Sequence, residues 1–242
     1  MEKAIIINRL DDLKYLKKEY QRIYFGNEFC ARLLPSKKDI DFLIKIIKKD
    51  KLSLSLLTSE VGSSGLKKTT DIIDYLAKKK ILDEVIINDY GIFNYLRKKY
   101  PFCQIVFGRI LSRSAILGAI GFLRKNSIRR IEFDNSIWSD TKLFKRRFLL
   151  KFSYYYPYFV FFNTRYCPVA GIKENKSKNH GIIDCSKECL KIGELEVLNL
   201  VFNKNKKAVL MGNTQFIKNK INLKKINKLN IDRLVFQPKI PI

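Results

Sequence analysis

The first half of the chain alternates short apolar runs, rich in β-branched residues, with longer amphipathic stretches. Runs of this kind are typical of strands, and apolar positions three and four apart are typical of helices. The runs predict strands at Ala4–Ile7, Arg22–Phe25, Leu52–Leu57, Glu84–Ile87, Gln104–Phe107 and Arg129–Phe133. The amphipathic stretches predict helices at Asp11–Tyr20, Ser36–Lys49, Thr69–Lys79, Asp89–Lys99 and Ser114–Lys125.

The helical pattern is clear in residues 36–49, where the apolar side chains fall on one face and Lys and Asp lie opposite. That apolar face consists of Ile40, Leu43, Ile44 and Ile47. N-caps are predicted at Ser36, Thr69 and Asp89, because such side chains accept hydrogen bonds from the first N–H groups of a helix. Pro101 follows the fourth predicted helix, where the helix is expected to have ended.

Strand–helix units repeated at this spacing require parallel strands joined by crossovers. We therefore predict an α/β fold of the (β/α) barrel type, a variant of the TIM barrel, whose functional loops lie at the carboxyl ends of the strands. A doubly wound sheet would give a similar pattern. No G-x-G-x-x-G follows the first strand, which counts against a dinucleotide-binding sheet.

The second half of the chain follows a different pattern. Residues 149–163 are dense in Phe and Tyr and predict two extended segments that meet at Pro157, and residues 171–184 are polar and predict a loop. Further strands are predicted at Glu194–Val201, Lys207–Leu210 and Arg233–Phe236, with a Lys/Asn-rich helix before the last of them. Since no linker or repeat divides the chain, residues 1–242 are expected to form a single domain.

The composition supports a packed core, because 46% of the 242 residues are hydrophobic and 12% are aromatic. The amino-terminal residues contain no hydrophobic stretch of signal-peptide length. No apolar run approaches the roughly 20 residues that span a bilayer. We expect a soluble, cytoplasmic protein with no membrane span.

The charge is strongly positive, with 48 Lys and Arg residues against 23 Asp and Glu residues and a net charge of +25. Such a field would attract RNA, DNA, anionic membrane surfaces or acidic metabolites. A second interpretation is that an AT-rich genome favours Ile, Lys and Asn codons, since these residues are abundant along the whole chain. Charge alone does not decide between the two.

Cysteines offer the candidate chemistry. There are five, an odd number, and no export signal, so metal binding or redox chemistry is a better interpretation than a disulfide framework. Cys30 and Cys167 each follow a predicted strand, and Cys185 and Cys189 form a C-x₃-C pair after the polar loop. Four thiolates that converge on one place would suit an iron–sulfur cluster or Zn²⁺.

The spacing favours some alternatives over others. Structural zinc sites usually contain two close pairs of ligands, whereas this chain has one close pair and two distant cysteines. Four free or buried thiols remain an alternative, and Cys103, at the start of an apolar run, is expected to be a buried core thiol. The one histidine, His180, lies in the polar loop and has no nucleophile pattern around it. Ser63–Gly65 lacks the sequence context of a phosphate-binding P-loop.

Several segments resemble the collagenase-like (U-thirty-two) peptidase family, in the same order along the chain. They are Ile23–Arg32 (IYFGNEFCAR), Val85–Gly91 (VIINDYG), Arg165–Cys167, the Cys185 and Cys189 pair, Gly212–Gln215 (GNTQ) and Ile231–Pro238 (IDRLVFQP). Within that family the chain is most similar to the small, single-domain UbiU and UbiV, the oxygen-independent hydroxylation proteins of ubiquinone synthesis. The resemblance covers nearly the whole chain.

The resemblance implies a (β/α) barrel variant in which Cys30, Cys167, Cys185 and Cys189 hold a [4Fe–4S] cluster. It also implies an oxygen-independent hydroxylase or hydroxylase subunit, with prephenate as the oxygen source and a homologous subunit as partner in a heterodimer. Other members of the family hydroxylate bases of tRNA or ribosomal RNA, so RNA base hydroxylation or RNA binding is the alternative function. Peptidase activity, which the family name suggests, ranks third because no nucleophile–base set or protease metal motif is visible.

Four further residues are candidates for binding an anionic organic donor such as prephenate. Asn88 and Asp89 end a predicted strand, and Arg32 and Arg109 lie just past two others. The alternative is that Asp89 caps a helix and that the arginines are ordinary surface groups.

Overall fold

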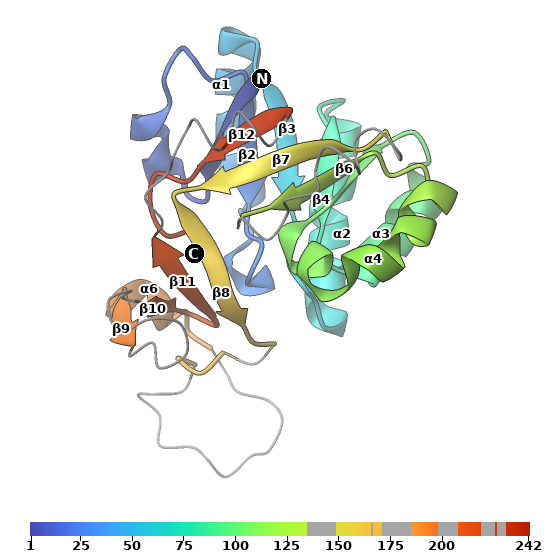
Figure 1. Cartoon of the computed structure of the whole chain (residues 1–242). Coiled ribbons are helices and arrows are strands. Elements are labelled where there is room, and N and C mark those ends of the chain that lie inside the picture. The colour runs from blue at the N-terminus through green and yellow to red at the C-terminus, as the bar shows by residue number, and fades with distance from the viewer. Residues whose placement is uncertain (135–148, 166, 171–184, 198–207, 219–225, 227–230) are drawn as a thin grey trace.

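Eight parallel strands form a closed barrel in the computed structural model, which describes residues 1–134, 149–165, 167–170, 185–197, 208–218, 226 and 231–242. The barrel strands are β1 (Glu2–Ile7), β2 (Arg22–Gly26), β3 (Ser53–Leu57), β4 (Glu84–Ile87), β5 (Gln104–Phe107), β6 (Arg130–Phe133), β7 (Lys151–Tyr156) and β12 (Arg233–Phe236). Strands β1 to β7 are neighbours in chain order, and β12 pairs with both β7 and β1 (Figure 1). The predicted barrel is thus confirmed over the doubly wound sheet.

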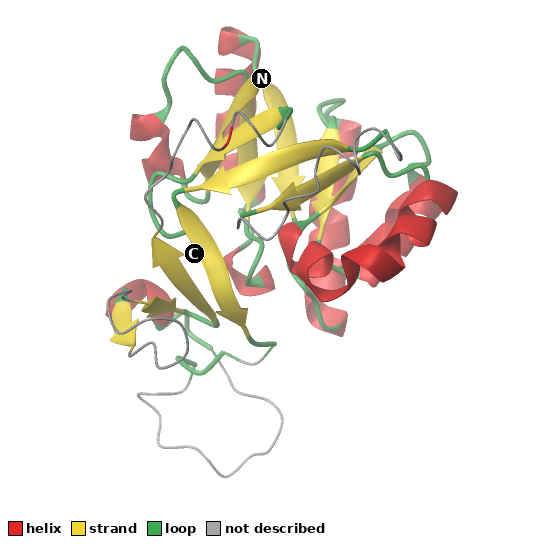
Figure 2. Ribbon diagram, in the orientation of Figure 1, coloured by secondary structure: helices red, strands yellow, loops and turns green. Residues whose placement is uncertain are grey.

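Helices cover the outside of the barrel between successive strands (Figure 2). They are α1 (Lys37–Asp50), α2 (Ser63–Lys78), α3 (Tyr90–Lys99) and α4 (Arg109–Lys125). The prediction of a helix over 11–20 is wrong, because the chain there forms only a short 3₁₀ helix, η1 (Leu10–Tyr15). Helices α2 and α4 also begin five or more residues before their predicted starts, since neither opens with a capping side chain that would mark its first turn.

Two of the three predicted N-caps are confirmed. The Ser36 hydroxyl accepts the Asp39 N–H and Asp39 reaches back to the Ser36 N–H, so the two residues form a capping box for α1. The Asp89 carboxylate accepts the Gly91 N–H at 2.6 Å at the start of α3. The N-cap predicted at Thr69 is wrong: it lies inside α2, where its hydroxyl donates to the Gly65 carbonyl.

A second, antiparallel sheet is inserted between β7 and β12 of the barrel (Figure 1). Its strands, in spatial order, are β8 (Tyr158–Asn163), β11 (Thr214–Lys218), β10 (Ala208–Met211) and β9 (Leu195–Val197), and the short helix α6 (Cys189–Ile192) precedes β9. The two segments predicted to meet at Pro157 are confirmed as β7 and β8. Strand β11 was not predicted, because its sequence TQFIK is short and only partly apolar.

The barrel and the second sheet are packed by separate apolar clusters. The larger one packs the outward faces of the barrel strands against α1 to α4. A second cluster joins the second sheet to the barrel loops, and in it the Phe29 and Phe216 rings meet edge to face at 5.2 Å. Phe29 follows β2, so this contact fixes the loop after β2 against the second sheet.

The inside of the barrel carries charge beside an apolar cluster that includes Ile6, Ile86, Val106 and Val235, whereas the interior of a (β/α) barrel is usually filled by apolar side chains alone. Arg233 in β12 is 2% exposed and donates to Glu84 at 2.7 Å and to Glu2 at 2.6 Å. Arg22 donates to the other Glu2 oxygen at 2.8 Å. These pairs link the amino-terminal ends of strands that lie on different sides of the barrel.

Higher in the barrel, Glu132 sits between two tyrosines. Tyr24 donates to it at 2.7 Å and Tyr155 donates to its other oxygen. Complete burial raises the pKa of Glu132 to about 7, although both tyrosine hydrogen bonds oppose the shift. Arg233 donates in turn to the Tyr24 hydroxyl at 2.6 Å, so the lower ion pairs and Glu132 belong to one network.

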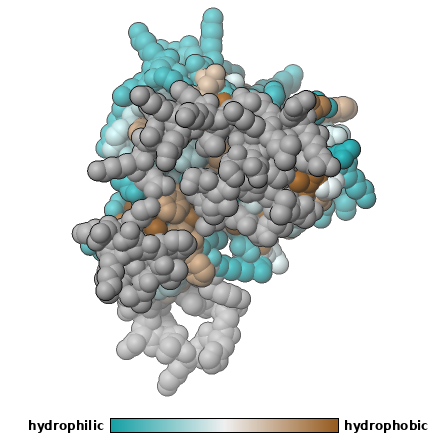
Figure 3. Space-filling model, viewed as in Figure 1, coloured by the Kyte–Doolittle hydropathy of each residue, from teal (hydrophilic) through white to brown (hydrophobic). Residues whose placement is uncertain are grey.

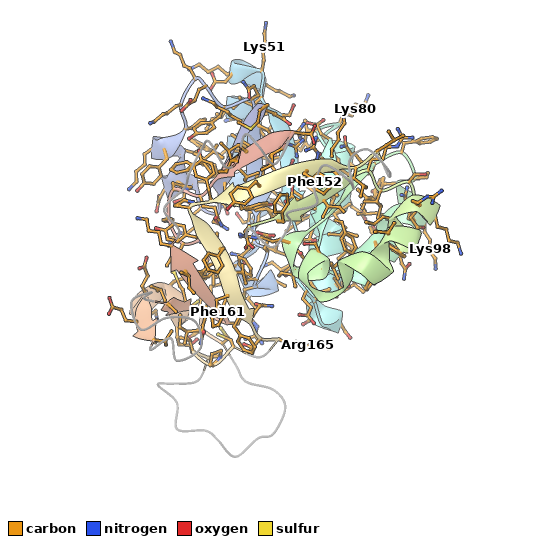
Figure 4. All side chains as sticks on the ribbon, in the orientation of Figure 1. Lys51, Lys80, Lys98, Phe152, Phe161 and Arg165 are labelled. Atoms are coloured by element: carbon orange, nitrogen blue, oxygen red, sulfur yellow. The ribbon has the colours of Figure 1, made fainter. Side chains whose placement is uncertain are left out.

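The visible surface is mostly hydrophilic where the structure describes it, and its hydrophobic areas are small (Figure 3). Lys51, Lys80 and Lys98 lie at the periphery, far from Arg165 (Figure 4). None of the helices among the described residues is both long and apolar enough to cross a membrane. The predicted polar loop at 171–184, with His180, and the predicted Lys/Asn-rich helix lie outside the described residues, apart from Ile226.

We expect Arg233→Met to destabilise the protein by about 3–5 kcal/mol, because it leaves Glu84 charged and buried without its partner. Urea unfolding followed by circular dichroism would measure the loss. The double variant Arg233→Met/Glu84→Gln should regain part of it, since no unpaired charge then remains at that position. The exposed Lys49→Met is the control, and an equal loss there would contradict the role given to Arg233.

Candidate metal centre

Cys30, Cys167, Cys185 and Cys189 line one cavity of about 830 Å³ at the carboxyl-terminal end of the barrel. They come from three separate segments: the loop after β2, the segment after β8, and the segment that leads into and begins α6. All four are free thiols in the structure. The second sheet brings the last three cysteines to the barrel end where the first one lies.

A sharp turn after β2 directs Cys30 into the cavity. Gly26 has φ +126°, and a Cβ there would lie 2.4 Å from the Leu57 carbonyl oxygen, so only glycine fits. The buried Asn27 side chain then accepts the N–H groups of Phe29 and Cys30 at 3.0 and 2.8 Å. This Asx-type turn holds the backbone of Cys30 at the start of the 3₁₀ helix η2 (Ala31–Leu33).

Asn213 ties the Cys30 loop to the segment that carries Cys167. Its side-chain amide donates to the Phe29 carbonyl at 2.9 Å and to the Thr164 carbonyl at 2.7 Å. It lies in the turn between β10 and β11, where Gly212 has φ +60° and a Cβ would lie 3.8 Å from the Cys189 Cβ. One turn therefore lies against all three segments that carry the cysteines.

Backbone N–H groups point at the sulfur atoms. The Cys185 sulfur accepts the Lys187 N–H at 3.4 Å. Backbone N–H groups of Val169 and Ala170 act to lower the pKa of Cys167, and that of Leu190 acts to lower the pKa of Cys189, because they favour the thiolate form. The same donors would remain available to metal-bound thiolates, and hydrogen bonds to the sulfurs are a main means of tuning a cluster's potential.

Burial raises the pKa of Cys167, and burial together with the neighbouring cysteines raises the pKa of Cys189 to about 11. Cys167, Cys30 and Cys185 each contribute to the raised pKa of Cys189, because neighbouring thiolates repel one another. A bound cation would remove that repulsion, because it offsets the negative charges that the thiolates share.

The described residues contain no group of three or more His, Cys, Asp or Glu side chains placed to share a single metal ion. A single Zn²⁺ would require four thiolates at Zn–S distances of about 2.3 Å. A cluster binds each thiolate at a different iron, so four cysteines that line one cavity would suit a cluster as well.

Basic side chains line the same cavity. They are Arg32, Lys68, Arg165 and Lys187, with Glu60 as the acidic lining residue among the described residues. Burial lowers the pKa of the Lys68 ammonium and nearby Lys187 adds to the effect, while Cys30 opposes it. The amino terminus of α2 also faces the cavity through Gly62, Ser64 and Gly65, and its N-cap Gly62 supplies no capping side chain.

Of the four residues predicted to bind an anionic donor, Arg32 lines the cavity. Asn88 is buried and joins three elements, since it donates to the Thr58 carbonyl at 2.8 Å and accepts the Ile110 N–H at 3.1 Å. Asp89 caps α3, as the alternative interpretation expected. Neither Asn88 nor Asp89 is among the lining residues, so both act within the fold.

Arg109 has no solvent exposure and does not line the cavity. Its guanidinium pairs with Glu28 at 2.8 Å and Asp134 at 3.1 Å and lies 4.2 Å from the centre of the Tyr155 ring. Two carboxylates already pair with the donors of Arg109, so its anion-binding role stays a prediction and its observed place is inside the fold. The alternative that it is a surface group is wrong.

Cys103 lies away from the four other cysteines, at the start of β5 and thus at the amino-terminal end of the barrel. It is half-buried and packs beside the large core cluster. Burial raises the pKa of its thiol to about 11. Cys103 was predicted to be a buried core thiol. It does pack against the core, but it is only partly buried.

Sequence reasoning missed Lys68, Arg165, Lys187 and Asn213. In a chain with 48 basic residues, no signal separates Lys68 and Lys187 from the rest. Arg165 and Asn213 each lie within a family-like segment, Arg165–Cys167 and Gly212–Gln215, and those segments were the signal that could have found them.

Comparisons with known proteins identify the fold. No protein-family model matches the sequence, and no curated protein matches it. Among solved structures, the U32 peptidase Mk0906 superposes with a TM-score of 0.60 and 14% identity, over 100% of this chain and 94% of that chain. This chain has the fold of a U32 peptidase.

Weaker likenesses are to plant chitinases. A GH18 chitinase from Cycas revoluta in complex with (GlcNAc)3 gives a TM-score of 0.43 at 7% identity, over 98% of this chain and 94% of that one. A class V chitinase from Nicotiana tobaccum gives 0.42 at 9% identity, over 97% and 92%.

We expect metal-free protein to be alkylated slowly at Cys189. With a pKa of about 11 instead of 9.0, its thiolate fraction at pH 8 falls about 100-fold. The iodoacetamide rate at Cys189, followed by peptide mass spectrometry, should rise about tenfold per pH unit and level off near pH 11. Protein unfolded in guanidinium should level off near pH 9, and the same plateau in folded protein would contradict the assigned environment.

Proposed function

We propose that Cys30, Cys167, Cys185 and Cys189 bind a [4Fe–4S] cluster and that the protein is an iron–sulfur component of an oxygen-independent hydroxylase. The observation that carries this proposal is the convergence of four thiols from three distant segments on one cavity. The fifth cysteine, Cys103, lies at the other end of the barrel. Thiols buried by chance would not be expected to gather four at one cavity and leave the fifth at the opposite end of the barrel.

The cavity also suits the charge of such a cluster. Four thiolates and the cluster core together carry net negative charge, and cationic side chains around the cavity would stabilise it. When bound, the cluster would supply one-electron transfer at the mouth of the barrel. A reducing cytoplasm, the location expected from the sequence, would keep the thiols available for assembly.

An anionic small molecule is the proposed co-substrate. Prephenate, which the family resemblance suggests as oxygen source, carries two carboxylates, and Arg32 and Arg165 offer planar forks that match such groups. Lys68 adds a third donor beside the amino terminus of α2. These residues would bind and orient the anion next to the cysteines, and a homologous subunit would complete the hydroxylase.

The structurally similar Mk0906 is named a peptidase, but the cavity of this protein suits peptidase activity less well. Cysteine nucleophiles in peptidases depend on a lowered thiol pKa. Burial instead raises the pKa of Cys167 and Cys189. Both thiols would be protonated at neutral pH, and a metal is the natural agent to deprotonate them.

Protein purified without oxygen should be brown and contain about four iron and four sulfide per chain, because four thiolates are the usual complement of a [4Fe–4S] cluster. Serine at Cys30, Cys167, Cys185 or Cys189 should lower the iron content and the absorbance near 400 nm. Iron and sulfide analysis with electron paramagnetic resonance spectroscopy would measure both.

Cys103→Ser is the matched control and should leave the iron content unchanged. Stoichiometric zinc without absorbance near 400 nm would refute the cluster and favour the zinc alternative. An equal loss of iron at Cys103 would show that the four ligands are wrongly chosen.

The double variant Lys68→Met/Arg165→Met should weaken prephenate binding to the cluster-loaded protein. Each charged hydrogen bond contributes about 1.5–3 kcal/mol, so removal of one or more predicts a loss of at least about tenfold in affinity. Isothermal titration calorimetry would measure it at constant iron content. The control is Lys48→Met/Lys49→Met on α1, and an equal loss there would leave only the general positive charge as the cause.

A further inference from the structure

A second cavity, of about 640 Å³, opens at the amino-terminal end of the barrel. Its wall includes the starts of β5, β6 and β7 and the turns that precede them. Cys30, Cys167, Cys185 and Cys189 do not line it. Nothing in the proposed hydroxylase function uses this end of the molecule.

The side chains around this cavity are strongly cationic. Arg97, Arg129, Arg130 and Lys151 line it, and Asp232 is the acidic residue among the described lining residues. The Asp232 carboxylate accepts the Phe152 N–H at 2.9 Å, which holds it to the start of the barrel. Four cations around one concave space repel one another, and a single carboxylate does not balance them.

Arg130 supplies a second, independent observation. Its side chain is 7% exposed and lines the cavity, and its Nη1 donates to the Ser153 hydroxyl at 3.1 Å. Its Nε is buried and has no hydrogen-bond partner among the described residues. A buried guanidinium N–H without an acceptor is costly, and an anion in the cavity would satisfy it.

The other cations are differently placed. Arg97 lies over the Phe93 ring and donates to the Asn126 carbonyl, so its position is fixed. Arg129 and Lys151 are exposed at the rim. The site thus has a buried, directional donor at its wall and exposed charges at its entrance, an arrangement that suits an anion.

We propose that this cavity binds a phosphate group. A phosphate monoester carries close to two negative charges at neutral pH and several acceptor oxygens, so it balances several cations where a carboxylate balances one. Guanidinium groups match phosphate with paired N–H donors. A free phosphomonoester brings both charges on one group, and a nucleic acid brings one charge on each successive phosphodiester. The fully exposed Phe102, between the lining residues Pro101 and Cys103, would let a base of a nucleic acid stack beside the cavity.

The test uses the full chain with its cluster content held constant. Inorganic phosphate, at constant ionic strength, should bind saturably by isothermal titration calorimetry and raise the Tm relative to chloride. Arg129→Gln/Lys151→Gln, which alters two exposed rim residues, should weaken phosphate binding about 10- to 100-fold. Arg130→Lys should also weaken it, because lysine keeps the charge but loses the Nε–H.

The matched control, Lys48→Gln/Lys49→Gln, removes the same charge from exposed positions on α1 and should leave phosphate binding unchanged. Absence of saturable phosphate binding at tens of millimolar would overturn the proposal. Equal weakening by the control pair would overturn it too, since the charge would then act without a site.

A single-stranded oligouridylate identifies the source of the phosphate. RNA binding that inorganic phosphate displaces, and that Phe102→Ala weakens without affecting inorganic phosphate, would support the site and assign it to a nucleic acid. Phosphate binding that RNA does not displace would support the site and assign it to a small phosphomonoester. RNA binding that neither phosphate nor the Arg129/Lys151 pair alters, together with no phosphate binding, would refute the site.

Discussion

The Arg109 guanidinium is buried at the carboxyl-terminal end of the barrel, between the Glu28 and Asp134 carboxylates and over the Tyr155 ring. Two carboxylates around one guanidinium satisfy its charge, and removal of either would leave an ion buried without its full set of partners. Each partner also holds a different part of the molecule. Glu28 lies two residues before Cys30, and Asp134 accepts the Val160 N–H of β8 at 2.8 Å. The position of the cysteine loop relative to the second sheet therefore depends on this cation together with the Phe29–Phe216 contact and the Asn213 hydrogen bonds.

The barrel itself was largely predictable from the sequence. The bounds of β4 and β5 agree with their apolar runs, because each strand is buried on both faces and its sequence shows an uninterrupted block. Helix boundaries were predicted wrongly where no capping side chain or stable helical packing marks them. Helix α2 begins at Ser63 after Gly62, which supplies no capping side chain, and the segment 11–20 carries a helical pattern but forms only one short 3₁₀ helix.

The four cysteines of the candidate site could be predicted from the sequence, whereas most of the basic residues around them could not. Cysteines are rare enough for their spacing to be informative, whereas Lys68 and Arg165 are two among many basic residues. Arg109 shows the limit most clearly. From its place after a strand it resembled a ligand-binding group, but its partners lie 81 and 25 residues away in the sequence, and only the folded barrel brings them together.

Strand β12 closes the barrel between β7 and β1, after the chain has completed the second sheet. Glu2 of β1 lies opposite Arg233 of β12. Barrel closure therefore joins parts of the chain that are distant in sequence, and the loop-closure entropy that this costs is lost late in folding. During synthesis, residues 30 and 189 are both made well before β12. The nascent chain must therefore carry its cysteines through a period in which the barrel that positions Cys30 is still open. Assembly of the proposed cluster would then have to wait for the last strand, or a chaperone would have to shield the thiols until that strand has paired.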